Sequence, residues 1–192
     1  EVITASHHSL IAHTEFLKEN FLMFGYEAMQ ALLRQYGVGL NLSGHLHAQH
    51  IASQNGLTDA ALGAFGAWPH RYALVTVGED GKIVYEARQL SAAFLPDCFQ
   101  EDSMAWYLGV ARDKVKASLN TENLTDEEAD LMADYAARFN LAYFSGTFDP
   151  SDPSWQNDPA WALWQRQTDS AFGLYMRLVM SEATMDNLFY SE

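Results

Sequence analysis

The hydrophobic pattern of the first half alternates between short apolar runs and one helical repeat. Residues 2–6 form a β-branched run that predicts a strand. Apolar residues then recur at helical spacing over residues 26–36, and Gly37 is a residue type that commonly ends a helix. Residues 38–42 predict a second strand. A strand, a helix and a strand in this order predict a right-handed crossover between two parallel strands.

A hairpin is predicted further along the first half. Residues 72–77 and 82–90 are strand-like, and the Glu-Asp-Gly sequence at residues 79–81 is typical of a tight turn between antiparallel strands. The first half therefore combines a parallel pair of strands, a crossover helix and a hairpin.

The second half has the apolar spacing of helices. One apolar face covers residues 104–119, and Thr125 with Glu128 forms a capping box that opens a helix reaching residue 143. We expect a loop over the proline-containing residues 149–158 and a further helix whose spacing continues to residue 178.

Asp158 and Pro159 are a cap and a favoured first-turn residue for that last helix. The many aromatic side chains of this half are expected to pack helices together, not to bind a cofactor. The fold class predicted is α/β, of the α+β kind, with residues 1–95 as one domain and residues 96–192 as an acidic, aromatic-rich, mainly helical extension.

Composition and charge narrow the classes of function. The 192 residues are 48% hydrophobic and 13% aromatic, enough for a packed core. The formal net charge is −14, which argues against nucleic acid or an anionic membrane as the main partner. Residues 1–95 carry 5 Lys or Arg and 8 Asp or Glu, a net charge of −3, so the remaining −11 lies in residues 96–192.

The seven histidines all lie within the first 70 residues, and two groups of them follow the predicted parallel strands. His7 and His8 follow the first strand, and His45 and His47 follow the second. The carboxyl ends of parallel strands meet at one edge of a sheet, where ligands bind in α/β proteins. In extended chain His45 and His47 point to the same side, whereas only one of His7 and His8 is expected to reach the shared cavity.

Imidazole is a ligand typical of Zn, Mn, Fe or Ni, so the two groups favour a metal site. His50 and His70 are interpreted as surface or core residues.

A strand ending in His-His and a strand ending in Gly-His-x-His (residues 44–47) resemble the last two metal-binding motifs of the calcineurin-like metallophosphoesterases. The resemblance covers roughly residues 1–95.

The resemblance implies a fold and roles for named residues. Residues 1–95 would be the C-terminal half of an αββα sandwich. His7 and His45 would bind one metal and His47 the second. His8 would support a ligand or face the substrate, and His13 would approach the phosphate.

The earlier motifs of that family (Asp-x-His, Gly-Asp-x-x-Asp and Gly-Asn-His-Asp/Glu) are absent from the sequence. Asp59 and Asp80 stand in other contexts. We therefore expect the C-terminal portion of a longer bacterial phosphohydrolase, in which two divalent ions (Mn, Fe or Zn) generate a bridging hydroxide that attacks a small-molecule phosphoester. This chain alone would hold at most one metal loosely and would not hydrolyse phosphoesters. Such a fragment would expose strand edges and an apolar face that the rest of the protein covers, so we expect it to self-associate.

A second hypothesis comes from a different class of protein. The chain could be a non-catalytic interaction module, in which the acidic helical half binds a partner and the histidines are structural. Retention of a metal that depends on His45 and His47 separates the two hypotheses.

Overall fold

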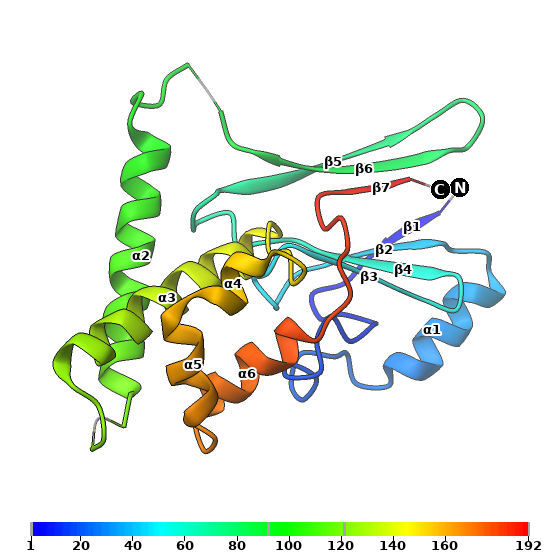
Figure 1. Cartoon of the computed structure of the whole chain (residues 1–192). Helices are drawn as coiled ribbons and strands as arrows, with labels where there is room; N and C mark the ends of the chain where they lie inside the picture. The colour runs from blue at the N-terminus through cyan, green and yellow to red at the C-terminus, as the bar shows by residue number, and fades with distance from the viewer. Residues whose placement is uncertain (1, 92, 121, 192) are drawn as a thin grey trace. The chain divides into compact units, whose positions relative to one another are not determined.

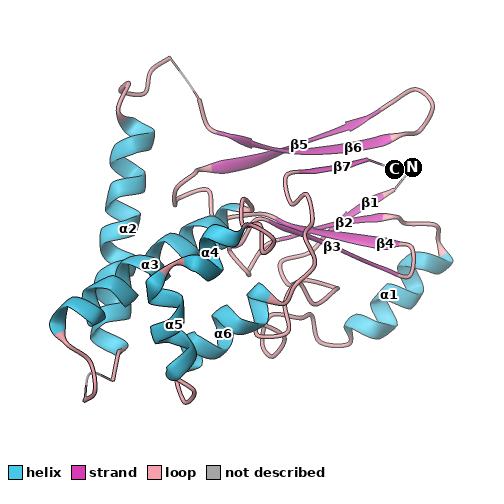
Figure 2. Cartoon of the chain, viewed as in Figure 1, coloured by secondary structure: helices cyan, strands magenta, loops and turns pink. Residues whose placement is uncertain are grey.

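A computed structural model describes residues 2–91, 93–120 and 122–191 (Figure 1). The predicted α+β class is confirmed, with six helices and two sheets in the described residues (Figure 2). The chain divides into two compact units. Unit 1 comprises Glu1–Leu95, Phe144–Thr147 and Met185–Glu192, and unit 2 comprises Pro96–Tyr143 and Phe148–Thr184.

The first sheet of unit 1 has four strands in the order β1-β2-β4-β3. Their bounds are β1 Ile3–Ala5, β2 Leu40–Ser43, β3 His50–Gln54 and β4 Leu57–Ala61. The expected parallel pairing of the first two strands is confirmed, with Ile3 opposite Leu40, and helix α1 (Tyr26–Gln35) connects them. Strands β3 and β4 form a hairpin that the hydrophobic pattern did not predict.

The second sheet of unit 1 is antiparallel, in the order β5-β6-β7. Its strands are β5 Arg71–Val77, β6 Ile83–Gln89 and β7 Phe189–Ser191. The predicted hairpin is confirmed: β5 pairs with β6, and the Gly78 N–H donates to the Lys82 carbonyl at 2.8 Å across the turn. Strand β7 arrives from the far end of the chain and was not predicted.

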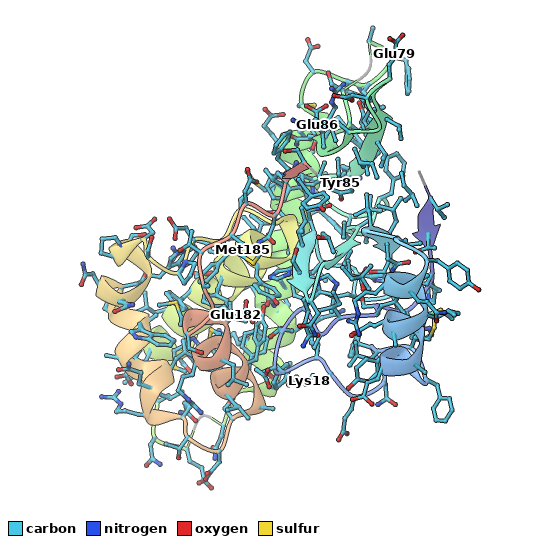
Figure 3. The ribbon with its side chains drawn as sticks, turned by 90° about the vertical axis from the view of Figure 1, so that its right-hand side faces the viewer. Lys18, Glu79, Tyr85, Glu86, Glu182 and Met185 are labelled. Carbon is cyan, nitrogen blue, oxygen red and sulfur yellow. The ribbon has the colours of Figure 1, made fainter. Side chains whose placement is uncertain are left out.

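The core of unit 1 lies on both faces of the four-stranded sheet. Residues between this sheet and α1 form one cluster: Leu10, Ile11, Leu33, Val38, Ala52 and Leu57. Residues between the two sheets form a second cluster: Leu40, Ile51, Ala60, Ile83 and Tyr85. Tyr85 is fully buried and its neighbour Glu86 is half-buried on the other side of β6 (Figure 3), as strand alternation requires. Unit 1 is thus layered as helix, sheet and sheet.

Unit 2 is helical. Its helices are α2 Phe99–Ser118, α3 Asp126–Ser145, α4 Pro153–Asn157, α5 Pro159–Arg166 and α6 Ala171–Met180. The capping box is confirmed, because Thr125 N–H donates to Glu128 Oε2 at 2.9 Å and Glu128 N–H to Thr125 Oγ1 at 3.1 Å. The aromatic side chains do pack the helices: Trp164 is buried, and its Nε1 donates to the Met132 carbonyl at 3.0 Å.

Two predictions for unit 2 were wrong. The predicted loop at residues 149–158 contains α4, because Asp152 accepts the Ser154 N–H at its N-terminus and Pro153 suits a first turn. The predicted continuous helix to residue 178 is two helices, since α5 ends at Arg166 and Ser170 caps a new helix through the Gly173 N–H. None of the described helices is long and apolar enough to span a bilayer.

Candidate active site

The two histidine groups meet at the carboxyl edge of β1 and β2. The strands are parallel, so the segments that follow them emerge side by side. The Gly44 N–H donates to the His7 carbonyl at 3.1 Å, which joins the two segments directly. The backbone therefore brings His7 and His8 next to His45.

Three imidazole rings form a compact cluster there. His7 Nε2 lies 3.1 Å from His45 Nδ1. The His8 and His45 ring centroids are 4.2 Å apart, and those of His7 and His8 are 5.2 Å apart. The Phe21 ring packs beside His45 at 5.3 Å. The structure thus brings both His7 and His8 to His45, where sequence analysis expected only one of them.

The cluster lowers the pKa of His8 below its ordinary value. Desolvation by the surrounding groups is the main cause, and the positive charges of His45 and His7 act in the same direction. His8 is consequently a neutral imidazole near pH 7, in the form that accepts a proton.

His47 does not join this cluster. Both His45 and His47 have left-handed backbones, with φ of 56° and 58°. The segment is therefore not extended, and the expected same-side arrangement of residues two apart is lost. His47 is exposed, and no hydrogen bond or ring contact links it to the other three rings within the described chain.

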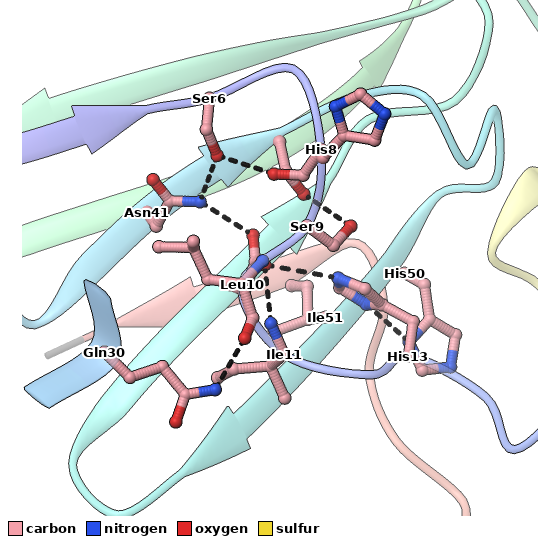
Figure 4. A network of polar contacts seen from close by, with 12 residues as sticks. Ser6, His8, Ser9, Leu10, Ile11, His13, Gln30, Asn41, His50 and Ile51 are labelled. Atoms are coloured by element: carbon pink, nitrogen blue, oxygen red, sulfur yellow. Dashed lines mark hydrogen bonds and ion pairs between the residues drawn. The ribbon is translucent and has the colours of Figure 1, made fainter. Parts of the chain in front are cut away.

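Asp59 of β4 organises the segment that follows His8. Figure 4 shows Leu10, Ile11 and Asn41, which donate hydrogen bonds to it. Asp59 is fully buried. Its Oδ2 accepts the N–H groups of Leu10 (2.5 Å) and Ile11 (3.1 Å), and its Oδ1 accepts from Asn41 Nδ2 at 3.1 Å. Burial alone would raise the pKa of this carboxyl, but His13, with further hydrogen bonds from Ser43 and Leu10, lowers it overall. Asp59 is thus a buried carboxylate.

His13 connects Asp59 to His50. His13 Nε2 lies 3.8 Å from Asp59 Oδ2, and its Nδ1 lies 3.2 Å from His50 Nδ1. Burial, followed by the proximity of His13, lowers the pKa of His50 to about 3, so His50 is neutral at physiological pH. His13 therefore lies in a buried polar network and not among the clustered rings.

The roles of Asp59, Asn41 and His50 were not predicted from the sequence. A signal for Asp59 was present, because an acid inside an otherwise apolar strand is rarely buried without polar partners. The contacts of His50 depend on the unpredicted hairpin and carried no comparable signal.

The cluster offers an incomplete set of metal ligands. His7 Nε2 and His45 Nδ1 are close enough to share one ion, but zinc sites usually draw three or four ligands from the protein. In residues 2–91, 93–120 and 122–191, no group of three His, Cys, Asp or Glu side chains is placed to hold a metal ion. The described residues alone thus contain no binuclear centre.

A comparison with protein families places the second half of the chain. Residues 97–186, somewhat less than half of the chain, match the C-terminal domain of cyclic nucleotide phosphodiesterase. No curated protein matches the chain. The match corrects the assignment to the calcineurin-like metallophosphoesterases and, with it, the prediction of a phosphoester hydrolase with a binuclear metal site. Through its helical half, the chain thus resembles one domain of a phosphodiesterase.

Proposed function

We propose that this chain is part of an enzyme that hydrolyses the phosphodiester of a cyclic nucleotide, and that His7, His8 and His45 face the phosphate. The observation that carries the proposal is the match of residues 97–186 to a cyclic nucleotide phosphodiesterase domain. The imidazole cluster of unit 1 supports it, because it lies at the sheet edge where ligands bind and combines a proton acceptor with potential donors.

The chemistry needed is modest and suits imidazoles. Water attacks phosphorus, the bond from phosphorus to one ribose oxygen breaks, and that oxygen takes up a proton. Neutral His8 is suited to accept the proton of the attacking water, a role that typically contributes about 10²–10⁴-fold to the rate. An N–H of the His7 and His45 pair directed at a phosphoryl oxygen would stabilise the charge that develops there.

A metal ion has a limited place in this proposal. His7 and His45 can offer two nitrogens to one divalent ion, such as Mn, Fe or Zn, held loosely. An ion bound there would supply Lewis-acid activation of water or phosphate. No step above depends on such an ion.

Histidine NMR tests the proposal on this chain. The ring C–H resonances of all seven histidines are followed while 3′,5′-cyclic AMP is added. Shifts are expected for His7, His8 and His45, while His50 and His70, which are buried elsewhere in unit 1, serve as internal controls. A His8→Ala variant is expected to weaken binding about tenfold, because it removes a ring of the cluster.

The matched control is His47→Ala, which removes an exposed imidazole outside the cluster and should leave binding within twofold. Unchanged resonances of the three clustered rings at millimolar nucleotide, or equal losses in the two variants, would refute the proposal. Binding is measured rather than product formation, because the proposal concerns which imidazole rings face the phosphate.

A further inference from the structure

Strand β5 forms an open edge of the three-stranded sheet. The sheet has the order β5-β6-β7, so β5 pairs with a neighbour on one side only. With seven residues, Arg71–Val77, it is the longest of the edge strands in the described residues, and Figure 2 shows it in a long hairpin with β6. Leu74 is 40% exposed and Val77 is 50% exposed. An edge of this length presents a row of backbone groups with which another strand can pair.

The hydrogen bonds that flank β5 identify which of its backbone groups point outward. The Gly78 N–H donates to the Lys82 carbonyl at 2.8 Å, and the Leu90 N–H donates to the His70 carbonyl at 3.1 Å. Hydrogen-bonded positions alternate in an antiparallel pair, so the even-numbered residues of β5 bond to β6. The odd-numbered residues direct their backbone N–H and C=O groups to the free side: Arg71, Ala73, Val75 and Val77. Within the described chain, these backbone groups form no hydrogen bond with another segment.

The edge strand β3 of the four-stranded sheet is protected where β5 is not. The Ile51 N–H of β3 donates to Asn187 Oδ1, and the Gln49 N–H just before β3 donates to the Phe144 carbonyl at 3.0 Å. Proteins also discourage pairing at an edge with proline or lysine. The sequence of β5, Arg-Tyr-Ala-Leu-Val-Thr-Val, contains neither residue and is rich in β-branched and aromatic side chains. The edge of β5 is therefore open to a partner strand.

We propose that two copies of this chain associate through β5, with the two strands antiparallel about a twofold axis at Leu74. In this register each outward residue lies opposite an outward residue of the partner subunit: Ala73 opposite Val75, and Arg71 opposite Val77. Each such pair exchanges two backbone hydrogen bonds, so every outward donor meets an acceptor. The two three-stranded sheets become one continuous sheet, and both copies use the same surface, as a closed dimer requires.

The side chains of β5 also fit this register. Leu74 lies against the partner's Leu74, and Tyr72 lies against the partner's Thr76 on the same face of the sheet. Aromatic and branched side chains stabilise cross-strand contacts of this kind. The one charged residue of the strand, Arg71, lies opposite a valine, so no like charges meet. This fit of the strand to itself favours a second copy over an unrelated strand.

The expected dimer is weak and reversible. Seven strand residues span about 23 Å, and a contact along one strand buries less than the roughly 800 Å² per partner of a standard interface. Sedimentation equilibrium of the full chain from about 10 µM to 1 mM should show an average mass that rises from monomer toward dimer. A mass that stays at the monomer, or one that rises past the dimer, would overturn the proposal.

Substitutions at Leu74 test the position of the twofold axis. Leu74→Lys and Leu74→Glu should each weaken association about tenfold, because like charges would meet across the axis. An equimolar mixture of the two variants should recover the dimer, because opposite charges then meet. The matched control is Phe189→Lys, which should leave association within twofold. Phe189 is 46% exposed on the same face of the sheet, opposite Glu86, which itself lies opposite Leu74.

Equal weakening by Phe189→Lys would mean that the faces of the sheets stack and that the edges do not pair. A mixture that stays monomeric would likewise refute the twofold axis at Leu74.

Amide hydrogen exchange of the unsubstituted chain gives a second measurement that needs no variant. The N–H groups of Ala73 and Val75 should exchange several-fold more slowly at about 1 mM than at about 10 µM protein, because they are bonded only in the dimer. Those of Tyr72 and Leu74 are already bonded to β6 and should exchange at the same rate at both concentrations. Equal exchange of Ala73 and Val75 at both concentrations would show that the edge of β5 is not in the contact.

Discussion

At the scale of single residues, Asp59 explains how the segment carrying the clustered histidines keeps its shape. The carboxylate accepts two backbone N–H groups from residues 10 and 11, which would otherwise be buried without partners. Asp59 belongs to no recognised motif, so the sequence alone does not single it out. Its role depends on β4 lying next to β2, which is a property of the folded sheet.

Replacing Asp59 by asparagine should disturb that segment although the side-chain shape is kept. The Asn41 amide has a fixed orientation, since its Oδ1 accepts from Thr4 and its Nδ2 donates to Ser6. The introduced amide must therefore turn its NH₂ group toward two N–H donors. We expect a loss of about 1–3 kcal/mol of unfolding free energy in urea and shifted ring resonances of His8.

The control for Asp59→Asn is Glu79→Gln, which neutralises an exposed carboxylate in the β5–β6 turn and should change stability by less than about 0.5 kcal/mol. Equal stability of the two variants would contradict the role given to the buried carboxylate.

His50 should make stability depend on pH. Its pKa is about 3 in the folded protein and near 6.5 when exposed, so between these values the unfolded chain binds more protons. Stability should therefore fall as the pH drops from 6.5 toward 3, with a slope of at most about 1.4 kcal/mol per pH unit from this residue. A His50→Gln variant should show a shallower slope in urea unfolding measured at several pH values.

The dependence of stability on pH should not vanish in His50→Gln. The pKa of His8 is also lowered in the folded protein, so His8 contributes a slope of the same sign. His47→Gln is the control, since His47 is exposed and outside both networks. An unchanged slope in His50→Gln would show that His50 is not a buried neutral group.

At the scale of elements, the sequence predicted those helices and strands whose apolar repeat is strong. The crossover over residues 2–42 and the hairpin over residues 72–90 are examples. The hairpin of β3 and β4 was missed although Asn55 and Gly56 both have positive φ (53° and 78°), as the favoured hairpin turn requires. An Asn-Gly pair between apolar strands was a usable signal.

Other elements could not be predicted from local sequence. Strand β7 has three residues, too few for a periodic pattern, and forms because β6 offers it a partner. The geometry of the histidine cluster could not be predicted either. It depends on the positive φ of His45 and His47, which follows from how that segment packs. Non-glycine residues adopt this conformation only where surrounding structure enforces it.

Gly146 directly follows α3 and belongs to residues 144–147, a short segment that is part of unit 1. We expect this position to tolerate no side chain. Its φ is +77°, and an added Cβ would lie 2.8 Å from both the backbone oxygen and the Cγ of Gln49. Gly146→Ala should therefore destabilise by more than the roughly 1–2 kcal/mol that the left-handed backbone alone costs an alanine. Thermal and urea unfolding measure the difference.

Gly37→Ala separates the two contributions to that loss. Gly37 has a similar φ of +70° but no atom within 4 Å of an added Cβ, so this variant carries only the backbone cost. If Gly146→Ala and Gly37→Ala lost equal stability, the close approach to Gln49 would be unimportant.

At the scale of the whole molecule, unit 1 is completed by residues far along the chain. Gln49 is fully buried, and its Nε2 donates to the Tyr85 hydroxyl and to the Asn187 carbonyl, at 3.0 and 2.7 Å. Asn187 Oδ1 in turn accepts the Ile51 N–H at 2.9 Å. Asn187 supplies both its carbonyl and its side-chain oxygen from more than 130 positions away, so no pattern within the first 95 residues reveals this partner.

Asn187→Ala should therefore destabilise unit 1 although it lies outside the first 95 residues. The change leaves the Ile51 N–H buried without its acceptor, which costs about 1–3 kcal/mol. Amide hydrogen exchange should speed up in β3 and leave the helices α5 and α6 of unit 2 unchanged. Asn157→Ala, at an exposed position in α4, should alter neither. Faster exchange spread evenly over both units would mean that Asn187 stabilises the chain as one cooperative body, and unaltered exchange in β3 would remove the role assigned to its side chain.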